Sequence, residues 1–176
     1  MADASSSPPG VTLSEIRPFA LTQLAAWPET LPRMAAEVAR IAGAAGAPGP
    51  CRGITGDKAH ILRVDPLKWW LIHDPDLVPG PLPDPEIGVM LDLSSARSRI
   101  AVEGPAAEDL LGQFLPLDLR SRAFPEGKIA VTAFRDIGVV LWRTAKGFNL
   151  LIPRSFATAL CDQMAESARQ YSVEIG

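Results

Sequence analysis

Two ten-residue stretches of similar pattern decide the expected fold: Arg63–Ile72 (RVDPLKWWLI) and Arg143–Ile152 (RTAKGFNLLI). Each places a polar turn between two apolar strands, and a helical pattern comes before the hairpin in each half of the chain. This recurring order predicts a duplicated α+β unit whose antiparallel strands carry helices on one face; the alternative is a chance similarity between two hairpins. Trp69 and Trp70 are neighbours on one strand, so one is expected in the core and the other at a second packed face or an interface.

Three helices are predicted around these hairpins. The first covers 30–43, where apolar residues recur every three or four positions. The second begins at Pro105 and stops at Pro116, and Ser155 is expected to cap the third. Residues 11–24 are expected to form an edge strand or an extended arm. The other strands are expected at 60–64, 69–72, 89–93, 99–103, 129–134, 139–142, 149–152 and 173–175.

The chain is expected to form one compact domain with four segments along the sequence. A disordered tail, 1–10, precedes a first α+β unit, 11–74, and a proline-rich linker, 75–88, leads to a second unit, 89–176. The linker is predicted because residues 75–85 contain five prolines, which lack the N–H groups that a helix or sheet interior needs. A length of 176 residues is enough to bury a stable interior.

The composition excludes several classes of protein. A formal net charge of −3 argues against a surface for nucleic acid or an anionic membrane, because phosphate neutralisation needs clustered cations. No apolar run approaches the ~20 residues of a membrane span. The first ten residues lack the basic and apolar segments of a signal peptide. We therefore expect a soluble, cytoplasmic protein.

Few residues could carry out catalysis or bind a metal. His60 and His73 are the two histidines, and each lies at the end of a predicted strand, where it is expected to be solvated. Neither has the spacing of a metal site or a nucleophile motif nearby. Cys51 and Cys161 are too few for a disulfide framework and are expected to be free thiols. The sequence predicts no catalytic residue, metal site or cofactor site in this chain.

One segment, Leu115–Gly127, has the features of a docking surface. It alternates apolar with charged residues between two prolines. Leu117, Leu119 and Phe124 are expected to be exposed, because the segment is too irregular to bury all of them. Rigid Leu, Phe and Arg anchors lose little entropy on binding, so a charge introduced at Leu119 or Phe124 is expected to weaken assembly. The alternative is a structural loop with solvated arginines. The predicted partner-interface residues are Leu117, Asp118, Leu119, Arg120, Phe124, Arg143, Arg154 and Phe156.

A set of short motifs runs through both halves of the chain. They are Ala26–Thr30 (AWPET), Arg63–Ile72, Val102–Leu111 (VEGPAAEDLL), Leu115–Leu119 (LPLDL), Ala123–Gly127 (AFPEG), Leu141–Thr144 (LWRT) and Leu151–Ala157 (LIPRSFA). Together they resemble the gamma subunit of heterotetrameric sarcosine oxidase. The resemblance runs from about residue 20 to the C-terminus, and LPLDL followed by PRSFA is its most specific part.

The resemblance implies a fold, partners and cofactors. Such gamma subunits are similar to the folate-binding part of glycine-cleavage aminomethyltransferases, with two ferredoxin-like or related α+β units. The beta subunit of the complex holds FAD and covalent FMN, the alpha subunit holds NAD and tetrahydrofolate, and the delta subunit binds zinc. The complex oxidises sarcosine to glycine with hydrogen peroxide and formaldehyde or methylene-tetrahydrofolate. This chain would carry no cofactor and would brace the folate-binding part of the alpha subunit, and through it contact beta and delta.

A departure from the aminomethyltransferase pattern concerns the folate site. Those enzymes carry an acidic residue beside a glycine-containing turn, and the corresponding turn here is Phe134–Gly138, in which Asp136 follows Arg135. Asp136 is a weak folate candidate, because a turn Asp is more often structural. Two alternatives remain open. The chain could be an autonomous folate-binding or aminomethyltransferase-like one-carbon protein, or a subunit of a related demethylating oxidase for another N-methyl amino acid.

Overall fold

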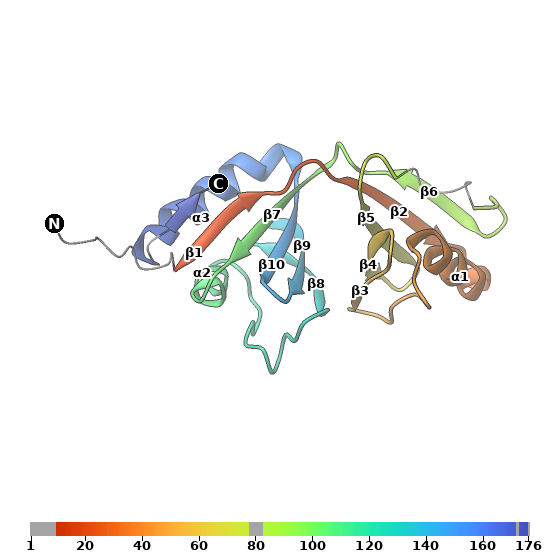
Figure 1. Ribbon diagram of the computed structural model, residues 1–176, viewed down its shortest axis with the longest axis horizontal. Coiled ribbons are helices and arrows are strands. Elements are labelled where there is room, and N and C mark those ends of the chain that lie inside the picture. The colour runs from red at the N-terminus through yellow and green to blue at the C-terminus, as the bar shows by residue number, and fades with distance from the viewer. Residues whose placement is uncertain (1–9, 78–82, 172, 176) are drawn as a thin grey trace.

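Two β-sheets pack against each other, with helices on their outer sides (Figure 1). The computed structural model describes residues 10–77, 83–171 and 173–175. Most of the predicted tail, 1–9, and the middle of the predicted linker, 78–82, lie outside the described residues. None of the described helices is both long enough and apolar enough to cross a membrane.

Sheet B has five strands and is covered on its outer face by one helix. Its order is β3-β4-β5-β2-β6, and all of its neighbouring strands are antiparallel. The bounds are β2 (Ala20–Ala26), β3 (Gly53–Thr55), β4 (Ala59–Asp65), β5 (Lys68–His73) and β6 (Gly88–Asp92). Helix α1 (Leu31–Ala42) buries the stripe that its spacing predicted, because Met34 and Val38 pack against Trp69 and Leu71 of the sheet.

Sheet A has six strands and carries two helices. Its order is β11-β1-β7-β10-β9-β8, with β11 parallel to β1 and the other pairs antiparallel. The strands are β1 (Val11–Glu15), β7 (Arg97–Glu103), β8 (Ile129–Phe134), β9 (Ile137–Thr144), β10 (Gly147–Pro153) and β11 (Val173–Ile175). Helices α2 (Ala107–Gly112) and α3 (Ala157–Ala168) cover its outer face, where Leu110 and Leu160 join the core of the sheet.

A third apolar cluster joins the two sheets. It contains Trp70 and Leu62 of sheet B and Trp142 and Leu151 of sheet A, all of them buried. Trp69 faces the α1 core, so the prediction that the two adjacent tryptophans serve different packed faces is confirmed. The predicted class, α+β with two antiparallel units and helices on one face of each, is also confirmed.

The two halves of the sequence exchange one strand each. In chain order, both halves read strand, strand, helix and then three strands: β1-β2-α1-β3-β4-β5 and β6-β7-α2-β8-β9-β10. The first strand of each half leaves its own sheet, because β1 pairs with β7 and β6 pairs with β2. The sheets therefore do not follow the predicted division into 11–74 and 89–176, although the order of elements repeats as the hairpins predicted.

Several local predictions differ from the structure. Residues 11–24, expected as one strand or arm, are two strands in different sheets. Ser155 does not cap the last helix, because it lies within a short 3₁₀ turn, Arg154–Phe156, that precedes α3. Thr30 lies at the start of α1 as predicted, but its hydroxyl does not cap the helix and instead donates to Ile87 O at 2.6 Å.

The candidate partner-binding segment and its surroundings

The Leu115–Gly127 segment connects α2 with β8 and closes one end of the sheet A core. Leu115, Leu119 and Phe124 are almost completely buried, at 3%, 4% and 3% exposure, and Leu117 is half-buried. The expectation that Leu119 and Phe124 are exposed is therefore wrong. The physical reason is that α2 is only six residues long, so that the segment, and not the helix, fills the rest of the core.

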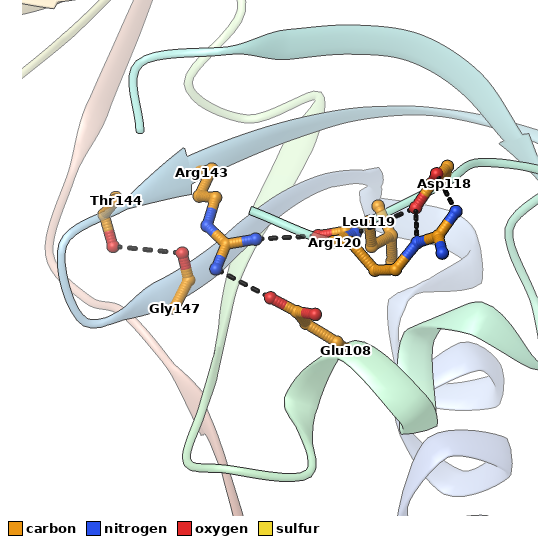
Figure 2. Close-up of polar contacts among 7 residues, drawn as sticks. All are labelled: Glu108, Asp118, Leu119, Arg120, Arg143, Thr144 and Gly147. Atoms are coloured by element: carbon orange, nitrogen blue, oxygen red, sulfur yellow. Dashed lines mark hydrogen bonds and ion pairs between the residues drawn. The ribbon is translucent and has the colours of Figure 1, made fainter. Parts of the chain in front are cut away.

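Arg143 fixes this segment to the sheet (Figure 2). From the end of β9, its Nη1 donates to Leu119 O at 2.7 Å and its Nη2 donates to Glu108 Oε1 of α2 at 2.7 Å. The guanidinium also lies over the Phe148 ring, 4.8 Å from its centroid. This predicted partner contact has its hydrogen bonds inside the chain, where it ties β9, α2 and the segment together.

Asp118 and Arg120 are the exposed polar part of the segment. Arg120 Nε donates to Asp118 Oδ1 at 2.7 Å, and a second contact between the two groups makes the pair bidentate (Figure 2). The hydrogen bond from Arg120 lowers the pKa of Asp118 to about 2, so the carboxylate is charged at any physiological pH. Both side chains are open to solvent, and their role in a partner interface stays a prediction.

Arg154 and Phe156 lie at the other end of sheet A. Arg154 Nε donates to Ser95 O at 2.8 Å and Nη2 donates to Ser94 O at 3.1 Å, so this side chain holds the turn between β6 and β7. Phe156 is exposed. The seven-residue strand β10 lies between these two residues and the end of the sheet that holds Arg143. At about 3.3 Å per residue, the predicted interface residues therefore fall into two groups roughly 20 Å apart.

Asp136 lies alone on the turn between β8 and β9. It is exposed, and it forms no hydrogen bond or ion pair with the described part of the chain. The backbone N–H of its exposed neighbour Arg135 donates to Phe114 O at 3.3 Å. Within the described ranges, no three His, Cys, Asp or Glu side chains gather closely enough to hold a metal ion. Asp136 stays a weak folate candidate.

A cluster of aromatic and cationic side chains between the sheets was not predicted. The His60 ring lies 4.8 Å from the Trp142 ring, and the Arg99 guanidinium lies 5.1 Å from the same ring while its Nε donates to Asn149 Oδ1 at 2.7 Å. Arg97 lies over Trp70 in the same way, at 5.1 Å. His60 and Arg99 line a pocket of about 370 Å³. His60 is half-buried, so the expectation that it is solvated is wrong.

The burial of His60 predicts a pH dependence of stability. Desolvation, with the Arg99 charge adding to it, lowers the pKa of His60 below its ordinary value of 6.5. The unfolded chain then binds more protons, so the free energy of unfolding should fall as the pH drops from about 6.5 through the lowered pKa. His60→Gln should remove this slope in urea unfolding measured between about pH 7.5 and 5.

The titration of acidic groups lies outside the pH range of this measurement. The pKa values of Asp92 and Asp118 are lowered, mainly by hydrogen bonds from Ser94 and Arg120. Their stabilising effect is therefore lost only as the pH falls below about 4, outside the window for His60. An equal slope in the wild type and in His60→Gln would contradict the assignment to this imidazole.

Comparison with known proteins gives one consistent group of relatives. No family model matches the chain. The sarcosine oxidase gamma subunit of Arthrobacter sp. is 39% identical over 88 residues, which are 47% of this chain and 43% of that protein. The gamma subunit of Corynebacterium sp. strain U-96 is 38% identical over 86 residues, 46% of this chain and 42% of that protein. Each match thus spans less than half the length of the curated relative.

The solved structures agree with the sequence relatives. A chain of heterotetrameric sarcosine oxidase from Corynebacterium sp. U-96, in complex with pyrrole 2-carboxylate, matches with a TM-score of 0.78 and 28% identity over 93% of this chain and 86% of that chain. Aminomethyltransferase T of the glycine cleavage system from Bartonella henselae matches with a TM-score of 0.65 and 14% identity, over 95% of this chain and 48% of that chain. The latter likeness concerns the fold alone. The predicted resemblance to sarcosine oxidase gamma subunits is confirmed.

Proposed function

We propose that this chain is a non-catalytic, gamma-type subunit of a sarcosine oxidase-like complex, in which it braces the alpha subunit. The observation that carries the proposal is the fold match over 93% of this chain to a chain of a heterotetrameric sarcosine oxidase. The identity of 39% to a gamma subunit adds support at the level of sequence. In this proposal, the complex oxidatively demethylates sarcosine to glycine.

The polar contacts of the chain support a bracing role. Arg143 and Arg154 direct their guanidinium groups to carbonyl and carboxylate oxygens of this chain, where they fix a core segment and a turn. Fixed loops suit a subunit that presents a rigid surface, because little conformational entropy is then lost on assembly. FAD, FMN, NAD and tetrahydrofolate belong, in this proposal, to the other subunits.

Assembly with flavin-bearing subunits tests the proposal. The chain, carrying an affinity tag, is co-expressed with the alpha-, beta- and delta-type subunits and purified through the tag and gel filtration. We expect a stable complex in which this chain elutes with the flavin absorbance and which forms hydrogen peroxide from sarcosine. A chain that elutes alone, separate from the flavin, would contradict the proposal. Turnover of other N-methyl amino acids by the same complex tests the related-oxidase alternative.

The folate-binding alternative is tested on the isolated chain. The Asp136 side chain forms no hydrogen bond or ion pair within the described residues, so the site does not favour this function. Tetrahydrofolate is titrated against the wild type and Asp136→Ala by calorimetry. We expect no difference between the two; micromolar binding that the variant loses would favour the alternative.

A further inference from the structure

The outer edge of sheet B has backbone groups without a described partner. Two hydrogen bonds show which way the backbone groups point. The N–H of Leu93, just after β6, donates to Leu21 O of β2, whereas the N–H of Ala26 in β2 donates to Leu67 O on the opposite side, toward β5. Hydrogen-bonding direction alternates along an antiparallel strand, so Val89 and Leu91 of β6 bond to β2. The N–H and C=O groups of the alternate residues, Gly88, Met90 and Asp92, point away from the sheet, and no backbone bond to them occurs within the described residues.

The same edge exposes large apolar side chains. Val89 and Leu91 are 46% and 53% exposed on the face that turns away from α1, whereas Met90 packs toward the α1 core. Trp27, which follows β2, is 45% exposed, and its Nε1 donates to Pro85 O at 3.0 Å. Edge strands are usually protected by lysine, proline or a bulge, and β6 (GVMLD) has none of these. An exposed apolar edge of this kind is suited to pairing with another strand.

The internal repeat indicates what this edge can accept. Strands β3-β4-β5-β2-β6 of sheet B correspond in order to β8-β9-β10-β7-β1 of sheet A, and all of these neighbours are antiparallel. Sheet A continues beyond this set, because β11 pairs with β1 in parallel, with Val11 opposite Val173. The described part of sheet B ends at β6. Within the described residues, no strand of sheet B takes the position that β11 fills in sheet A (Figure 1).

We infer that an extended segment of a partner subunit pairs with β6 in parallel and continues sheet B, as β11 continues sheet A. Main-chain hydrogen bonds would hold the segment, and its alternate side chains would cover Val89 and Leu91. The exposed acidic residues Asp84, Glu86 and Asp92 border the edge, so we expect basic residues in the segment. A second copy of this chain would instead meet β6 about a two-fold axis, with the two β6 strands antiparallel. The inference rests on the proposed function, since it needs the partner subunits.

Leu91→Lys in the co-expressed complex tests this surface. The side chain is already half exposed, so the variant should fold, as checked by its thermal unfolding. A lysine within a desolvated contact should weaken the affinity for the partner subunits about 30-fold or more. Val131→Lys is the matched control, because Val131 is 61% exposed on β8, an edge strand of sheet A, and its change should leave the affinity unaltered.

Hydrogen exchange of the wild-type complex gives a second reading. Amides of the 88–92 peptide should exchange at least about tenfold more slowly in the complex than in the isolated chain. A wild-type complex with no protection there, and with normal affinity in Leu91→Lys, overturns the inference and leaves the proposed function intact. A wild-type chain that meets no partner at all defeats the proposed function and, with it, the inference. An isolated chain that is dimeric, and becomes monomeric in Leu91→Lys, assigns the edge to a second copy and also overturns the inference.

Discussion

Replacing Phe124 with alanine is expected to lower the free energy of unfolding by about 3–5 kcal/mol, because the change leaves a cavity in the core of sheet A. The Phe124 side chain is 3% exposed, and its ring centroid lies 6.3 Å from that of Phe148. Deleting a buried aromatic ring loses both its transfer free energy and its packing contacts. Urea unfolding of the isolated chain, with the slope m held equal, measures the change.

Phe156→Ala is the matched control for this prediction. Phe156 is 46% exposed, so the same deletion should change the free energy of unfolding by no more than about 0.5 kcal/mol. Phe124→Asp should prevent folding, because it buries a charge without a partner. If Phe124→Ala retained wild-type stability and lost only its binding to partner subunits, the side chain would be part of an interface, as the sequence first indicated.

The order of elements could be predicted from the sequence, whereas the exchange of strands could not. The hairpins and the apolar stripe of α1 are local patterns. A proline in a turn, and apolar residues repeated every three or four positions, can each be recognised within about ten residues. The partner of β1 is set by packing between sheets, and the sequence of 11–24 reads as one continuous extended segment. Nothing local indicates that the chain passes to the other sheet between β1 and β2.

The candidate site was predicted in part. Asp118 and Arg120 are exposed, as a docking surface requires, but Leu119 and Phe124 are core residues. An apolar residue in an irregular segment belongs to no periodic pattern that would show whether it faces the core or the solvent. The burial of Leu119 and Phe124 therefore follows from the short length of α2. The exposed edge at Val89 and Leu91 could not be predicted either, because an apolar strand has the same sequence pattern whether it lies inside a sheet or at its edge.

Arg143→Met is expected to lower the free energy of unfolding by about 2–4 kcal/mol. Methionine keeps an apolar stem over Phe148 but leaves the Glu108 carboxylate and Leu119 O without their donor. The Arg143 side chain is 17% exposed and that of Glu108 is 34% exposed, so solvent replaces part of the lost interaction for the carboxylate. Urea unfolding of the isolated chain measures the loss.

A double-mutant cycle separates the two bonds of Arg143. Glu108→Gln removes the charge but keeps an oxygen that can accept from Nη2, so alone it should cost about 1 kcal/mol. Arg143→Met already removes the contact with Glu108, so adding Glu108→Gln should cost little more, and the double variant should resemble Arg143→Met and not the sum of the two changes. Simple additivity would show that the ion pair does not couple α2 to β9. In that case the bond to Leu119 O alone would fix the segment, and Arg143→Lys, which can reach that oxygen with a single donor, should restore most of the stability.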